Sequence, residues 1–158
     1  MEFEGLSASP ELVITGCRAS NAEEVIRLLS GLALKKGYVN ALFIEKILER
    51  EQEYPTGLQT AVPIAIPHVH DGCSKSFFAM AAMAEPVDFG AMDGSEEPVK
   101  AELVFLFGIT DPSRQTAVLR RFSTLFQKEE LLRAFTHAAD SGELLTKLKE
   151  VLGDYILL

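Results

Sequence analysis

Apolar residues fall along the chain in two patterns, continuous runs and repeats at helical spacing. The continuous runs predict buried strands, because a strand covered on both faces has no polar side. Such runs lie at residues 64–66 and 77–84 and within residues 101–109, and another at residues 12–14 suggests a first strand. Residues 103–107 are apolar throughout, which predicts that this strand is central.

The repeats at helical spacing predict helices in the first third of the chain. Ser20, followed three residues later by Glu23, is a capping box, and Gly37 is typical of the end of the helix that it opens. Asn40 can cap a second helix, which we expect to end near residues 50–51. The apolar faces of these helices are Val25, Ile26, Leu28, Leu29 and Leu32 in the first, and Phe43, Ile44, Ile47 and Leu48 in the second.

The last third of the chain is predicted to be helical. Asp111 and Pro112 are a cap and a first helical residue, residues 128–138 form a second helical segment, and Ser141 starts a third. Strand and helix patterns therefore alternate along the chain without a composition break or an internal repeat. We expect an α/β fold with a mixed central sheet of about five strands, flanked by helices on both faces.

Composition and charge narrow the class of protein. With 158 residues, 47% of them hydrophobic, we expect a single compact domain over residues 1–158, with residues 1–10 approximately as an N-terminal lead-in. The net charge of −8 argues against nucleic acid and anionic membranes as partners, since both select basic surfaces. The sequence has neither a membrane-length apolar run nor a signal-like segment, so we expect no membrane insertion. Cys17 and Cys73 fit two reduced thiols in a cytoplasmic protein.

His68 is the residue most suited to chemistry. It follows the apolar run 64–66 directly after Pro67, which lacks the N–H that sheet pairing needs. Pro67 is therefore expected at an edge of the sheet or at the place where pairing stops. We expect His68 to lie where the strand leaves the sheet, a common place for ligand sites in α/β folds. An imidazole there, with an unperturbed pKa near neutrality, suits a nucleophile or a proton carrier.

A metal site is an alternative interpretation of the same region. His68, His70 and Asp71 have the spacing of two imidazoles and a carboxylate around a divalent ion, as in a metal-dependent hydrolase. The supporting ligand motifs are missing, because His137 lies far along the chain and neither cysteine belongs to a Cys-x-x-Cys pair. We therefore favour a surface role for His70 and expect neither a metal nor a cofactor.

The order of several short motifs resembles a known family. The matching pieces are Leu48-Glu49-Arg50-Glu51, Thr56-Gly57-Leu58, Ile64-Ala65-Ile66-Pro67-His68, Pro86-Val87-Asp88-Phe89-Gly90, the strand at 102–109 and the helix from Gln115. Together they resemble the enzyme IIA domains of the fructose–mannitol branch (type 2) of the bacterial sugar phosphotransferase system. The stretch from Ile66 to Asp71, and Asp111-Pro112 before Gln115, are most similar to the galactitol-type members.

The resemblance implies a phosphotransferase component that relays a phosphoryl group. In the family a histidine accepts phosphate from the phosphocarrier protein HPr and passes it to a cysteine of the cognate enzyme IIB, and His68 corresponds to that histidine. The chain would then serve the uptake of galactitol or a related carbohydrate. A regulatory module, like the nitrogen-related members that act by phosphorylation-dependent protein binding, is the main alternative.

Three further site residues follow from the resemblance. Arg50 would bind the phosphate through its guanidinium, although without the family a solvated residue at a helix end would be the better interpretation. Glu51 has a weaker claim, since it could orient Arg50 or face water. Gln115 stands where many relatives carry a second histidine, and an amide can donate to a phosphate oxygen without titrating. Arg114 beside it is a candidate for restoring the positive charge.

Overall fold

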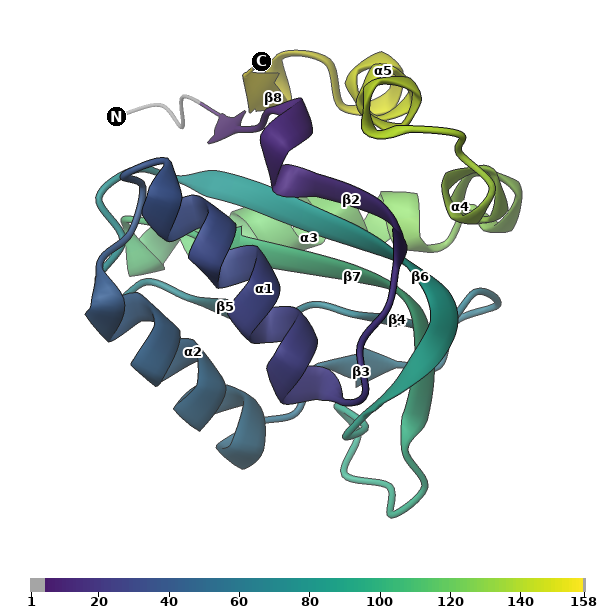
Figure 1. Cartoon of the computed structure of the whole chain (residues 1–158), viewed down its shortest axis with the longest axis horizontal. Helices are drawn as coiled ribbons and strands as arrows, with labels where there is room; N and C mark the ends of the chain where they lie inside the picture. Colours follow the sequence, from purple (N-terminus) through teal and green to yellow (C-terminus); the bar gives the residue numbers. More distant parts are fainter. Residues whose placement is uncertain (1–4, 158) are drawn as a thin grey trace.

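A mixed sheet forms the middle of the protein (Figure 1), whose structure is a computed structural model describing residues 5–157. Its centre is the antiparallel pair β6 (Phe77–Phe89) and β7 (Val99–Gly108). Phe77 lies opposite Gly108 and Phe89 lies opposite Val99, with a register shift between Ala82 and Val87. The sheet order is β3-β4-β7-β6-β1-β8, with β2 also on β6 and β5 also on β7. The shorter strands are β1 (Leu6–Ser7), β2 (Val13–Cys17), β3 (Gly57–Leu58), β4 (Ile64–Ala65), β5 (His68–Val69) and β8 (Ile156–Leu157).

The expected mixed α/β architecture is confirmed, with more strands than expected. The sheet has eight strands among the described residues, against about five predicted. The excess consists of strands of two residues such as β1, β3 and β8, which are too short to produce a periodic pattern. One of them, β1, belongs to the expected lead-in and pairs with β6 and β8, while residues 1–4 lie outside the described part.

Helices cover both faces of the sheet (Figure 1). The helices α1 (Ala22–Lys35) and α2 (Ala41–Glu53) pack on one face, and α3 (Gln115–Phe126), α4 (Glu129–Thr136) and α5 (Ser141–Leu152) pack on the other. Along β7, Val104 and Leu106 point to the first layer, whereas Phe105 and Phe107 point to the second. Both faces are buried along residues 103–107, which explains why this part of the strand is apolar at every position.

The helix ends agree with the sequence signals to within a few residues. The helix α1 is capped by Asn21, one residue after the expected Ser20, and Glu24 accepts from the backbone N–H of Ser20 at 3.2 Å. Asn40 caps α2 as expected. This helix continues to Glu53, so residues 50 and 51 lie in its final turn rather than at its end.

The path around Pro67 differs from the prediction. Strand β4 pairs with Leu103 and Val104 of β7, and pairing on the same neighbour resumes immediately after the proline, with His68 opposite Phe107. Of the two expected positions for Pro67, an edge of the sheet and the end of pairing, the end of pairing is therefore wrong, because β5 continues on β7 beyond the proline. The proline carbonyl oxygen still accepts from the N–H of Phe107 at 3.0 Å, because proline lacks only the donor of the ladder.

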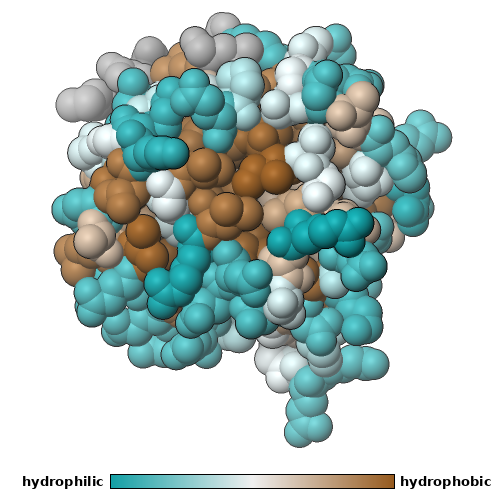
Figure 2. Space-filling view, viewed as in Figure 1, coloured by the Kyte–Doolittle hydropathy of each residue, from teal (hydrophilic) through white to brown (hydrophobic). Residues whose placement is uncertain are grey.

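The face that carries α1 and α2 has an apolar area near its middle, surrounded by hydrophilic residues (Figure 2). Leu28 and Leu34 on α1 and Leu42 on α2 are each more than 40% exposed. None of these leucines lines the cavity that holds His68. No helix in the described part of the chain is both long and apolar enough to cross a membrane.

Candidate functional site

The imidazole of His68 is buried and oriented by the main chain. Its Nδ1 atom lies 2.7 Å from the carbonyl oxygen of Ile66, and the residue is 7% exposed. A carbonyl only accepts hydrogen bonds, so Nδ1 carries the proton and donates, which leaves the lone pair of the neutral ring on Nε2. Burial, assisted by the positive charge of Arg50, lowers the pKa of His68 despite this hydrogen bond, so the neutral form is favoured.

A cavity of about 670 Å³ brings three of the predicted site residues together. It is lined by His68, by Arg50 from the last turn of α2 and by Gln115, the first residue of α3. Residues 90–95, which follow β6, line another side of it, and the half-exposed Met92 belongs to this segment. Residues far apart in sequence therefore meet around one imidazole.

Arg50 is the positive group of this cavity. Its Nε atom is buried and makes no hydrogen bond to any described residue, and its guanidinium carbon lies 5.6 Å from the centroid of the Tyr54 ring. Stacking on an aromatic ring orients a guanidinium without using its N–H groups. A buried donor without a partner is costly, so this group is suited to an anion that enters the cavity.

Gln115 lies at the start of a helix rather than on a loop. The short 3-10 turn Pro112–Arg114 precedes it, and the Asp111 carboxylate accepts from the N–H of Ser113 at 3.0 Å to cap that turn. The N-terminal end of α3, which carries partial positive charge, therefore lies beside the cavity through Gln115. Arg114 is half-buried and is not among the residues that line the cavity.

Glu51 does not line this cavity, although it follows Arg50 directly. Its Oε2 accepts from the N–H of Thr56, and its Oε1 accepts from the Thr56 hydroxyl, both at 2.8 Å. Burial raises the pKa of Glu51 to about 7, although both hydrogen bonds and Arg50 oppose the shift. The hydrogen bonds of the carboxylate therefore go to Thr56 rather than to Arg50.

Thr56 is a site residue that the sequence analysis did not single out. It is 3% exposed and lines the cavity with His68, and its hydroxyl accepts from the N–H of Ile66 at 3.2 Å. It belongs to a motif that matches the family, but a threonine beside a glycine is too common a pattern to indicate a role. Its role depends on the contact with Ile66, which lies ten residues later in the chain, so no local sequence pattern indicates it.

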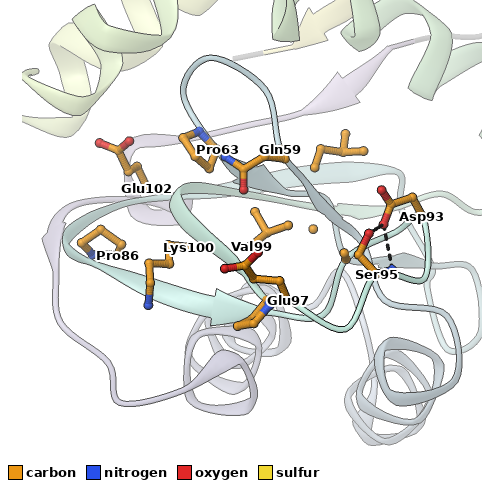
Figure 3. A pocket seen from close by; sticks show the side chains of 13 residues that line it. Gln59, Pro63, Pro86, Asp93, Ser95, Glu97, Val99, Lys100 and Glu102 are labelled. Carbon is orange, nitrogen blue, oxygen red and sulfur yellow. Dashed lines mark hydrogen bonds between the residues drawn. The ribbon is translucent and has the colours of Figure 1, made fainter.

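A second cavity of about 890 Å³ lies on the other side of residues 91–98 (Figure 3). It shares Ala91 and Ser95 with the first, and its polar lining includes Glu97, Lys100 and Glu102. The Asp93 carboxylate at its edge is already bonded to the N–H and the hydroxyl of Ser95 (Figure 3).

The metal alternative finds no support in the geometry. Among the described residues, no group of three or more His, Cys, Asp or Glu side chains could hold a metal ion. His70 Nε2 lies 3.7 Å from Asp71 Oδ1, and both side chains are more than a third exposed.

Comparison with protein families and curated proteins gives one consistent result. Residues 7–151 match the model of the family described as "Phosphoenolpyruvate-dependent sugar phosphotransferase system, EIIA 2". The mannitol-specific phosphotransferase enzyme IIA component of Geobacillus stearothermophilus is 27% identical over 146 residues, which cover 89% of this chain and 94% of that protein. The galactitol-specific EIIA component of Escherichia coli K12 is 26% identical over 147 residues, covering 92% and 94%. The expected likeness to galactitol-type members is thus shared with the mannitol type.

Solved structures agree with this result. The crystal structure of the mannitol IIA of Escherichia coli superposes with a TM-score of 0.76 at 26% identity and covers 89% of this chain and 98% of that one. The nitrogen regulatory protein IIA-Ntr of Neisseria meningitidis shares the fold, with a TM-score of 0.74 at 19% identity and coverage of 89% and 94%. By its matched family model, this chain belongs to the type 2 enzyme IIA family and is a phosphotransferase component of the sugar phosphotransferase system.

Proposed function

We propose that this chain is a phosphoryl carrier that accepts phosphate from HPr on Nε2 of His68 and passes it to a cysteine of a cognate enzyme IIB. The observation that carries the proposal is the hydrogen bond from Nδ1 to the Ile66 carbonyl, because it leaves Nε2 as the free nucleophilic atom of a neutral ring. The cavity beside this ring provides room for a phosphoryl group.

The transfer needs positioning more than covalent chemistry. The lone pair of Nε2 attacks phosphorus in line, the N–P bond forms, and the bond from phosphorus to the donor breaks with its electron pair returning to the donor. In the second transfer a thiolate of enzyme IIB attacks phosphorus, and the electron pair of the N–P bond returns to Nε2. Throughout, the proton on Nδ1 stays in its hydrogen bond to Ile66, which stabilises the positive charge on the phosphorylated ring.

Arg50 and Gln115 are the proposed phosphate partners. Arg50 offers positive charge and N–H donors at the cavity, and its buried Nε lacks a partner among the described residues. The amide of Gln115 can donate one further hydrogen bond to a phosphate oxygen, but it adds no charge and takes no part in proton transfer. Charge neutralisation therefore rests mainly on Arg50.

The partners follow from the family and from one solved complex. The mannitol enzyme IIA of Escherichia coli has been solved in complex with phosphorylated mannitol enzyme IIB, and it superposes on this chain with a TM-score of 0.76 at 25% identity. We expect a corresponding contact around His68 here, in the cytoplasm, for the uptake of galactitol or a related carbohydrate.

The test is phosphorylation by phosphoenolpyruvate through enzyme I and HPr, followed by intact mass measurement. Wild type should gain one phosphoryl group, about 80 Da, and His68→Ala should gain none. His70→Ala, two residues away on the same segment, is the matched control and should react like wild type. Absence of phosphorylation in folded wild type, with a donor pair active on another enzyme IIA, would refute the proposal. Phosphorylation without transfer to any enzyme IIB would favour the regulatory role instead.

A further inference from the structure

Four residues form a continuous chain of hydrogen bonds that ends at the imidazole of His68. The Glu51 carboxylate accepts from the Thr56 hydroxyl and N–H, and the Thr56 hydroxyl accepts from the N–H of Ile66. The carbonyl of Ile66 then accepts from Nδ1 of His68. Three of the four residues, all except Glu51, are less than 10% exposed, so water does not readily replace these bonds.

Ile66 needs such support because of its place in the chain. It lies between the two-residue strands β4 and β5, and it belongs to neither. Its N–H is bound by the carbonyl oxygen and the hydroxyl oxygen of Thr56, at 3.3 and 3.2 Å, rather than by a neighbouring strand. Thr56 therefore determines where the Ile66 backbone lies, and with it the carbonyl group that orients the imidazole.

We propose that Thr56 is a positioning residue for His68, and that Glu51 acts through it by holding the Thr56 hydroxyl in place. The proposal rests on the proposed carrier function. The Thr56 hydroxyl has a single hydrogen, which it donates to Glu51, so its lone pairs remain directed toward the Ile66 N–H. Glu51 thereby fixes the direction in which Thr56 accepts.

The consequence for the reaction is a choice of tautomer. When Ile66 is held in place, Nδ1 carries the proton and Nε2 is free to attack. When the Ile66 carbonyl moves away, the neutral ring is free to carry its proton on Nε2, where it blocks attack on phosphorus. The Thr56 hydroxyl is bound by Glu51 and Ile66, so its loss should act through the tautomer and reduce the reactive fraction of His68.

The critical variant is Thr56→Val, which keeps the size and the branched β-carbon of threonine and removes only the hydroxyl. Thr56→Ser is the matched control, because it retains the hydroxyl. Two quantities are measured: the ¹⁵N chemical shifts of the His68 ring, which report the tautomer, and the single-turnover rate of phosphorylation at varied phospho-HPr. Thr56→Val should shift the ring toward the tautomer protonated on Nε2 and slow the saturated rate roughly tenfold, with half-saturation unchanged. Thr56→Ser should restore both.

Glu51→Gln tests the other end of this series of hydrogen bonds. It also replaces Thr56→Val as the test if Thr56→Val does not fold. Its amide keeps one acceptor oxygen and replaces the other with an N–H₂ group, which cannot accept, so the same changes should appear with smaller amplitude. Unchanged ring shifts and rates in a folded Thr56→Val, or in Glu51→Gln if that is the only folded variant, would overturn the positioning role. Failure of wild type to accept phosphate would refute the carrier function alone, because the ring shifts still decide whether Thr56 sets the tautomer.

Discussion

Nδ1 of His68 lies 2.7 Å from the carbonyl oxygen of Ile66, only two residues earlier in the chain. The intervening residue is Pro67, which has no N–H for the sheet ladder and separates the two short strands β4 and β5. The bond assigns the two ring nitrogens different roles before any partner binds. One nitrogen anchors the ring, and the other is available for chemistry.

The first prediction concerns the protonation of His68. Because burial lowers its pKa, the ring should titrate below the ordinary value of about 6.5 for histidine. Ring ¹H–¹⁵N spectra recorded from pH 4 to 8 should show His68 neutral and protonated on Nδ1 at pH 7. A ring that is charged at pH 7, or one whose proton lies on Nε2, would contradict the assignment of Nε2 as nucleophile.

The second prediction concerns the charge at the cavity. Arg50→Ala should slow phosphorylation of His68 roughly 100-fold, by analogy with the loss of one donor to a developing negative charge. Arg50→Lys should recover only part of the rate, since an ammonium group lacks the planar fork that binds two phosphate oxygens. Arg114→Ala is the matched control, because Arg114 does not line the cavity. Equal effects of the Arg50 and Arg114 variants in single-turnover assays would rule out a specific role for Arg50.

The third prediction separates hydrogen bonding from charge at Gln115. Gln115→Ala should slow phosphorylation by about tenfold, the value of one hydrogen bond to a charged group. Gln115→Glu should be slower still, because its carboxylate repels the phosphate, and Thr116→Ala on the exposed next position should react like wild type. If Gln115→Ala were slower than Gln115→Glu, the charge at this position would not act as described.

Particular residues show which parts of the site the sequence predicts. His68 was identified from its position after an apolar run and a proline, and Arg50 and Gln115 were identified from the resemblance to the family. The structure brings all three to one cavity. The contact between Thr56 and Glu51 was not foreseen, because it spans a helix end and a turn, where side-chain direction does not follow from periodicity. Hydrogen bonds between side chains in such turns depend on the folded backbone.

The same distinction applies to the fold. Long elements such as β7, α1 and α5 each bury many apolar side chains, so their hydrophobic pattern is clear in the sequence. A strand of two residues such as β5 is formed by its neighbour in the sheet, and two positions carry no period. His68 was expected where the strand leaves the sheet, whereas it lies within the short paired strand β5.

The fourth prediction concerns packing below the site. A side chain at Gly108, which pairs with Val69 of β5, would collide with the ring of Phe77 and approach the sulfur of Cys73 at 3.0 Å. Gly108→Ala should therefore lower the free energy of unfolding by about 1–3 kcal/mol, the usual cost of overpacking a core. Gly31→Ala is the opposite control: its β-carbon meets no atom within 4 Å, and it should stabilise helix α1 by roughly 0.5–1 kcal/mol. Urea denaturation of both variants measures whether the free energy of unfolding falls in Gly108→Ala and rises in Gly31→Ala.

The fifth prediction concerns the pH dependence of stability that Glu51 introduces. Its pKa is raised from 4.5 to about 7 in the folded protein, so between these values the folded state binds a proton that the unfolded state has released. The contribution of Glu51 to stability is therefore fully present below pH 4.5 and is lost as the pH rises through 7. At about 1.4 kcal/mol for each pH unit between the two pKa values, the loss is about 3 kcal/mol.

The variant Glu51→Gln isolates this effect, because glutamine does not titrate. The difference in unfolding free energy between wild type and Glu51→Gln should fall by about 3 kcal/mol from pH 4 to 8. The charged groups that lie around Glu51 are Arg50 beside it, and Glu23 and Asp88, which line the same small cavity. All three are present in both proteins, as is His68, whose lowered pKa affects stability in the opposite direction, so these contributions cancel in the difference.

Glu45→Gln, an exposed change on the same helix, controls for the loss of one negative charge. A difference between wild type and Glu51→Gln that stays constant over this range would mean that Glu51 remains ionised on folding and that burial does not determine its charge.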